Sequence, residues 1–123
     1  MLLKTEKDKG KEGEKLAAEY LREQGYTILY CNWIGNHKEL DIVCTKDNQL
    51  VVVEVKNRES WNHLDIRELI PPSKIKNIID GTELFIAEKN PQKEVRFDVI
   101  IVNTMKSPPN IQHIVSAFNA LDY

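Results

Sequence analysis

The run "LVVVEVKNR", from Leu50 to Arg58, limits the possible folds more than any other part of this sequence. Its closely spaced valines predict a buried β-strand. The same strand carries Glu54 and Lys56, an acid and a base two residues apart, and a buried charge is costly unless another group compensates for it. We therefore expect this strand to belong both to the core and to a functional site.

The first third of the chain has the pattern of one helix followed by strands. Apolar residues at helical spacing predict a helix over residues 11–24, and Gly25 is well placed to end it. Residues 1–10 are highly charged, and we expect them to be loose. Runs rich in β-branched and aromatic residues follow at 26–34 and 38–45 and predict two strands.

The rest of the chain predicts a hairpin, a second helix and a fourth strand. Asp47 and Asn48 favour a tight turn into the strand at 49–58. Ser73 is a good N-cap for a helix whose weak point is Gly81. The last two segments are a strand at 95–103 and residues 111–121, which fit a strand, a helix, or one followed by the other.

The bulk properties indicate one soluble domain, residues 1–123. The hydrophobic and charged fractions, 41% and 29%, are ordinary for a globular protein. No apolar run approaches the roughly 20 residues of a membrane helix, and the start has no signal-peptide pattern, so we expect a cytoplasmic protein without membrane contact. Cys31 and Cys44 are too few for a disulfide scaffold, and we expect both to be small core residues.

Strand alternation and the predicted turn bring the charges of the hairpin onto one face. Asp41 is then directly opposite Glu54, and Glu39 is directly opposite Lys56. The other face of the second strand carries Leu40, Ile42 and Cys44. Two opposed carboxylates about 5 Å apart destabilise a sheet, and a divalent cation would compensate, since Mg²⁺ favours one or two carboxylates with waters and phosphate oxygens. The alternative is a solvated face on which Glu39 and Lys56 form an ion pair.

At these residues the sequence resembles a known group of nucleases. "ELDIV", then about a dozen residues, then "VEVK", is similar to the D…ExK signature of the PD-(D/E)xK superfamily. The segments "GKEGEKLAAEYLREQGYTILYCNW", "KELDIV", "VVVEVKNR", "SKIKNII" and "VRFDVIIV", in this order, resemble the small bacterial YraN-like family, which is similar to archaeal Holliday-junction resolvases. The resemblance implies an α/β, restriction-endonuclease-like fold with a central mixed sheet flanked by helices, in the order α-β-β-β-α-β.

The resemblance also implies roles for individual residues. Asp41 and Glu54 match the motif acids that bind metal, and Lys56 matches the catalytic lysine. Glu14 matches an acid of the first helix that approaches the metal in resolvase-like members, although the helix dipole alone also favours an acid there. Glu39 matches the acid two residues before the motif aspartate, and either metal binding or pairing with Lys56 would suit it.

Three basic residues are candidates for nucleic-acid contacts. Lys74 matches a lysine at the start of the second helix, with a solvated surface lysine as the alternative. Lys38 stands where the family usually has a glycine, which alters how closely the backbone can approach a substrate. Arg58 belongs to a local excess of basic over acidic side chains between Lys56 and Lys76.

Other polar residues carry weaker signals. Arg96 and Asp98 share a face of the fourth strand, and we expect them to pair with each other. The three histidines have no mutual spacing typical of metal ligands, and we expect them at the surface; they are His37, His63 and His113.

These observations support three classes of function. The first is a Mg²⁺- or Mn²⁺-dependent endonuclease that hydrolyses DNA phosphodiesters, with branched or damaged DNA as candidate substrates and Lys56 beside the attacking water. The second is a nucleic-acid-binding module without activity, against which the intact D…ExK set argues. The third is an adaptor domain, which the net charge of -2 favours. Resolvase-like relatives are dimers, so a homodimer is a candidate assembly.

Overall fold

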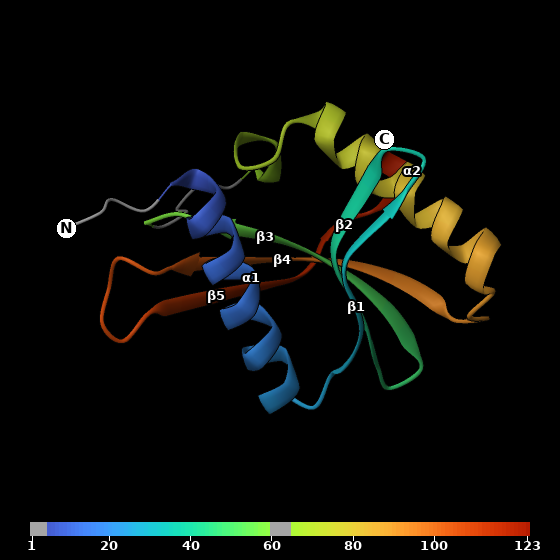
Figure 1. Ribbon diagram of the computed structural model, residues 1–123. Helices are drawn as coiled ribbons and strands as arrows, with labels where there is room; N and C mark the ends of the chain where they lie inside the picture. The colour runs from blue at the N-terminus through green and yellow to red at the C-terminus, as the bar shows by residue number, and fades with distance from the viewer. Residues whose placement is uncertain (1–4, 60–64) are drawn as a thin grey trace.

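The protein is built on a twisted five-stranded sheet with one long helix on each face (Figure 1). The computed structural model describes residues 5–59 and 65–123. In these ranges the helices are α1 (Glu6–Glu23) and α2 (Pro72–Lys89), with short 3-10 helices at Ile66–Glu68 and Ala120–Asp122. The strands are β1 (Thr27–Gly35), β2 (Lys38–Lys46), β3 (Gln49–Asn57), β4 (Glu94–Asn103) and β5 (Asn110–Phe118).

The strands lie in the sheet in the same order as in the chain, from β1 to β5. β3 and β4 are parallel, and all other neighbours are antiparallel. A parallel pair needs a long crossover connection, which α2 provides. The fold is α/β with the order α-β-β-β-α-β-β, consistent with the restriction-endonuclease-like fold expected from the resemblance. The expected order lacked β5, because residues 111–121 fitted several structures; they form this strand and then a 3-10 turn.

Helix α1 begins earlier than predicted. Thr5 caps it, accepting a hydrogen bond from the backbone N–H of Asp8 at 3.1 Å, while the Asp8 side chain accepts one from the backbone N–H of Thr5. This capping box satisfies N–H groups that the first turn would leave unpaired. The expectation that residues 1–10 are loose is therefore wrong for residues 6–10, and residues 1–4 lie outside the described part. Gly25, with a φ of 90°, follows the helix end as predicted.

Helix α2 begins at Pro72, so the prediction that Ser73 caps it is wrong. Proline suits the first helical position, because its φ is already helical and it has no N–H group to leave unpaired. Gly81 lies where α2 presses on β2: a Cβ atom there would come within 3.1 Å of the Lys38 Cβ and 3.3 Å of the Leu40 Cδ2. The glycine predicted as a weak point therefore permits close packing of helix on strand.

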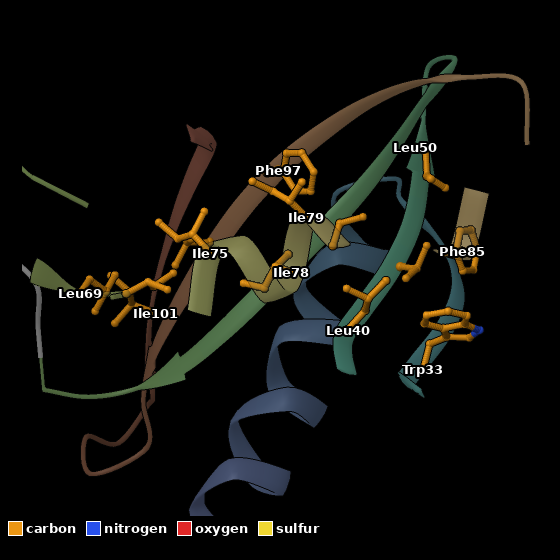
Figure 2. Packing of buried hydrophobic residues seen from close by; sticks show 14 residues of the cluster. Trp33, Leu40, Leu50, Leu69, Ile75, Ile78, Ile79, Phe85, Phe97 and Ile101 are labelled. Carbon is orange, nitrogen blue, oxygen red and sulfur yellow. The ribbon is translucent and has the colours of Figure 1, made fainter. Parts of the chain in front are cut away.

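The core has two layers, one on each side of the sheet. On one side Ile75, Ile78 and Phe85 of α2 pack with Leu40 and other buried residues, as Figure 2 shows. On the other side α1 contributes a second cluster, which joins Ala17, Ala18 and Leu21 to Ile42, Cys44 and Val53. β3 has a core on both faces, so the prediction of a buried strand at its centre is confirmed.

The two cysteines differ in burial. Cys44 is fully buried, as predicted, and burial raises the pKa of its thiol to about 12. Cys31 is exposed, so the prediction for it is wrong. It lies on β1, which is an edge strand of the sheet. In the described part of the chain, neither helix is both long and apolar enough to cross a membrane.

Candidate active site

The hairpin of β2 and β3 brings Asp41 close to Glu54, but not through the pairing that was predicted. The tight turn sets the expected register as far as the pair of Ile42 and Val53, where the paired positions end. Beyond that point the Asp41 Oδ2 accepts a hydrogen bond from the backbone N–H of Val55 at 2.9 Å. The Asp41 side chain thus takes the acceptor role that a backbone carbonyl has in a continuous ladder.

The alternation of side chains along β2 also breaks at Asp41. Leu40 packs in the α2-side cluster and Ile42 in the α1-side cluster, although strict alternation predicted that they share a face. On β1 the register places Asn32 across from Asp41, and Asn32 has a left-handed backbone with a φ of 55°. Asparagine tolerates this conformation better than most residues. Because the backbone is irregular at both Asn32 and Asp41, the Asp41 side chain does not follow the regular alternation of the strand.

Glu54 is a buried carboxyl group, only 4% exposed, with two lysines beside it. Its Oε2 lies 3.6 Å from the Nζ of Lys56 and 3.9 Å from the Nζ of Lys74. Burial, a hydrogen bond with Asp41 and the Asp41 charge raise the pKa of Glu54 to about 8, against the lowering effect of the two lysines. Without a bound cation this carboxyl group therefore holds a proton at neutral pH.

Glu14 lies within electrostatic range of Asp41 and of Glu39, but these acids do not form a single metal-binding cluster with Glu54 in the described residues. Burial raises the pKa of Glu14, a hydrogen bond with the Asn32 side chain lowers it, and the charges of Asp41 and Glu39 raise it further. Across residues 5–59 and 65–123, no three Asp, Glu, His or Cys side chains stand close enough together to hold a metal ion. The structure thus gathers two of the four predicted metal ligands, Asp41 and Glu54.

The predicted opposition of Glu39 and Lys56 across the hairpin is wrong, because the β2–β3 register ends before these positions. Glu39 lies opposite Ile34 of β1, and Lys56 lies beside Ile101 of β4. The Nζ of Lys56 instead lies closest to the Glu54 carboxyl group, two residues away on the same strand. A cross-strand ion pair on a solvated face therefore does not account for these charges.

The predicted nucleic-acid contacts differ in position. Lys74 lies at the first turn of α2 beside Glu54 and is partly exposed. Lys38 donates a hydrogen bond to the Oδ1 of Asn77 on α2 at 2.9 Å, which fixes its amino group against that helix. Arg58 is exposed just after β3, where its backbone N–H bonds to the carbonyl of Val102.

A second polar cluster surrounds Asp98, which is fully buried. Arg96 donates to both oxygens of Asp98, at 2.9 and 2.8 Å, so the predicted pairing is confirmed. The Nε2 of His113 lies 2.7 Å from Asp98, and its Nδ1 lies 3.0 Å from the hydroxyl of Tyr20 on α1. The prediction of a surface position is wrong for His113, whose side chain is 9% exposed, because β5 turns it under α1. His37 is exposed as expected, and His63 lies outside the described residues.

The sequence model of the family described as "Uncharacterised protein family UPF0102" matches residues 13–102, the range that holds every candidate site residue. This chain belongs to that family. Relatives include the UPF0102 protein of Phocaeicola vulgatus, 40% identical over 109 residues, which are 89% of this chain and 90% of the relative. The UPF0102 protein of Flavobacterium psychrophilum is 36% identical over 111 residues, 90% and 93% of the two chains. The resemblance to the YraN-like group is thereby confirmed.

In this UPF0102 member, the Asp41–Glu54 pair suits a divalent cation. Carboxylate oxygens are the ligands that Mg²⁺ and Mn²⁺ prefer, and Mg²⁺ often takes only one or two of them from the protein. The raised pKa of Glu54 means that the surrounding groups do not fully stabilise a negative charge on both Asp41 and Glu54. A cation in place of the proton would remove that imbalance, since metal binding releases protons from its ligands.

Proposed function

We propose that this protein is a metal-dependent nuclease that hydrolyses DNA phosphodiesters, with Mg²⁺ or Mn²⁺ held by Asp41 and Glu54. The observation that carries the proposal is the contact between the buried carboxyl group of Glu54 and the half-buried carboxyl group of Asp41, with Lys56 beside Glu54. Two acids in contact inside a protein destabilise it unless a ligand offsets their repulsion. A domain that only binds nucleic acid, or only connects proteins, has no need for such a pair.

Each residue of the site has its own task in this proposal. The chemistry that a bound divalent ion supplies is neutralisation of phosphate charge and a more acidic water. Lys56 is placed to orient the attacking water or to stabilise charge that develops on the phosphate oxygens. Lys74 stands on the first turn of α2, where a helix terminus also attracts phosphate. Asp41 is oriented for its role by the backbone N–H of Val55.

The charge of the protein bears on the substrate. A net charge of -2 gives little general attraction to long duplex DNA. The local excess of basic side chains between Lys56 and Lys76 favours a short contact around the site. We therefore propose branched or damaged DNA, recognised by its shape, as the substrate class, with a homodimer as the assembly that would double this surface.

The decisive experiment is a cleavage assay. Purified protein is incubated with labelled single-stranded, duplex, flap and four-way-junction DNA in Mg²⁺ and in Mn²⁺. Glu54→Gln, which keeps the size of the side chain, is purified identically, and Glu83→Gln on the exposed surface of α2 is the matched control. We expect cleavage by the wild type and by Glu83→Gln, at least 100-fold slower cleavage by Glu54→Gln, and none with EDTA.

Two results would overturn the nuclease proposal. Equal cleavage by the wild type and Glu54→Gln would identify a contaminating nuclease. No cleavage of any substrate, with no heat of Mn²⁺ binding in calorimetry, would leave the binding-module or adaptor alternative. Mn²⁺ binding that requires Glu54 would support the assigned ligands independently of any substrate.

A further inference from the structure

A groove between α1 and β1 adjoins the candidate active site and takes no part in the function proposed above. Its volume is about 430 Å³. Ala18 of α1 and Cys31 of β1 line its apolar part, while Glu14 and Asn32 line the polar part. A cavity of this size holds about as much as a drug-sized molecule and cannot enclose a duplex.

Basic side chains follow this groove along one side of α1. Lys11, Lys15 and Arg22 all line it, and all three are exposed. Lys11 and Lys15 are about 6 Å apart along the helix axis and Arg22 lies roughly 10 Å further on. The cations outnumber the acids in the groove, which are Glu14 and Glu19. The groove thus combines a row of positive charges with a small apolar floor.

The groove is continuous with the site through Glu14 and Asn32. These two residues line the groove, and they interact with each other. Glu14 also lies within the electrostatic field of Asp41, the motif aspartate. If Asp41 and Glu54 hold a cation and the reacting phosphate lies beside it, the polymer would continue from the site into this groove, past its basic side chains.

We propose that the α1–β1 groove binds a single-stranded segment of the nucleic acid next to the phosphate that is cleaved. Lys11, Lys15 and Arg22 bind its phosphates, and the floor at Ala18 and Cys31 accommodates a sugar or base. The inference rests on the proposed nuclease function for the position of the reacting phosphate. It makes the preferred substrate a junction between duplex and single strand, such as a flap.

The first test measures binding without catalysis. In a Glu54→Gln background without metal, fluorescence anisotropy follows a labelled single-stranded oligonucleotide and its duplex at several salt concentrations. Alanine at Lys11, Lys15 and Arg22 together should weaken single-strand binding at least tenfold and lower the salt slope by about 2, since each phosphate contact on a single strand contributes roughly 0.7. The control is Lys93→Ala, which removes a cation that bonds to Asn48 in the turn before β3.

The outcomes separate this inference from the nuclease proposal. An unchanged slope in the triple variant, or an equal loss on duplex and single strand, would overturn the groove assignment even if the protein cleaves DNA. A reduced slope in a protein that cleaves nothing would support the groove and reject the nuclease. Each single alanine variant is measured as well, so that a folding defect in the triple variant does not decide the result.

A second test uses the two cysteines. Cys31 lines the groove and is exposed, while Cys44 is fully buried and serves as the internal control. A saturating single-stranded oligonucleotide should slow the reaction of Cys31 with a thiol reagent at least fivefold, because the strand covers the groove floor. An equal rate with and without the oligonucleotide, at a concentration where anisotropy shows full binding, would contradict the proposal.

Discussion

Glu54 is the residue at which the core and the candidate site meet. Its neighbours Val52 and Val53 belong to the two opposite core layers, so the strand that carries Glu54 is closed to water on both faces. Lys56 and Lys74 supply positive charge, but Asp41 and burial outweigh it, and the pKa of Glu54 remains near 8. The ionised form of Glu54 is therefore unfavourable in the metal-free site, and a bound cation would stabilise it.

This cost predicts how stability depends on pH. The folded protein binds the Glu54 proton up to about pH 8, whereas the ordinary pKa is 4.5. Between pH 6 and 8 the free energy of unfolding of the metal-free wild type should therefore fall, by roughly 2 kcal/mol from this group. Glu54→Gln should remove that fall. Urea unfolding in EDTA at pH 6, 7 and 8 measures it, with Glu83→Gln as the control; parallel curves for all three proteins would contradict a buried, protonated carboxyl group.

Asp98 is also a buried carboxyl group, but its pKa is lowered, whereas that of Glu54 is raised. Burial alone would raise its pKa, but hydrogen bonds from His113, Arg96 and the Ser116 backbone more than offset burial and lower it. The paired carboxylate thus stabilises the folded protein above the ordinary carboxyl pKa, and this contribution is lost as the pH falls through the lower, folded value.

Asp98→Asn should therefore lower the free energy of unfolding by about 3–5 kcal/mol at pH 7, because it leaves the half-buried Arg96 without a negative partner in a fully buried position. It should also make stability less dependent on pH below 4. Urea unfolding measures both effects. Asp65→Asn is the control, since Asp65 makes a comparable pair with Arg67 at the surface and should change stability little. Equal effects of the two substitutions would contradict the assignment.

At the scale of elements, α2 approaches β2 closely at Gly81. A Cβ atom added at Gly81 would lie 3.1 Å from the Lys38 Cβ and 3.3 Å from the Leu40 Cδ2. The same approach brings Lys38 within reach of Asn77 on α2. The Lys38 side chain is thus held by the helix.

Two glycine substitutions test this packing. Gly10 is in α1 with no atom within 4 Å of an added Cβ, so Gly10→Ala should stabilise the protein by about 0.5–1 kcal/mol. Gly81→Ala has the same gain in helix propensity but meets the Lys38 Cβ at 3.1 Å, and we expect a net loss of stability. Thermal unfolding of both variants measures the difference. A similar gain at both positions would mean that α2 can move away from β2 freely.

The molecule as a whole is organised around β3, the central strand of the sheet. β2, β3 and β4 each have a strand neighbour on both sides, whereas β1 and β5 form the two edges. β1 exposes Leu29, Tyr30 and Ile34. The homodimer expected from resolvase-like relatives stays a prediction, and sedimentation equilibrium would measure it.

This arrangement predicts an order of local stability. Amide hydrogens of Val51, Val52 and Val53 should exchange slowest, because β3 lies in the middle of the sheet and between both core layers. Amides of β1 and β5 should exchange faster. Hydrogen exchange followed by mass spectrometry would measure the order, and protection of β1 equal to that of β3 would contradict it.

Several features of the molecule follow from local sequence alone. The valine run of β3, the Asp47–Asn48 turn and the apolar faces of both helices lie where their patterns predict them, because each pattern depends on residues close together in the chain. The hairpin turn even sets the correct register over its first pairs. The motif residues Asp41, Glu54 and Lys56 could be identified for the same reason.

The rest depended on contacts between distant segments. The β2–β3 register ends at the pair of Ile42 and Val53, because the Asp41 side chain bonds to the backbone of Val55. No local sequence pattern indicates such a break. Asn32, in an otherwise apolar strand, was the available signal of an irregular backbone, since asparagine is rare in strands and common at positive φ. His113 became buried only because β5 lies under α1, far away in sequence.

The sequence by itself thus determined the family, both long helices, the first four strands and the candidate site residues, since these follow from short-range patterns and motif spacing. Only the tertiary structure decided how the charges meet. It separated Glu39 from Lys56, placed Lys74 beside Glu54 and opened a groove along α1. Burial and electrostatic coupling are properties of packed, distant segments, and they take their values only when the sheet and both helices are assembled.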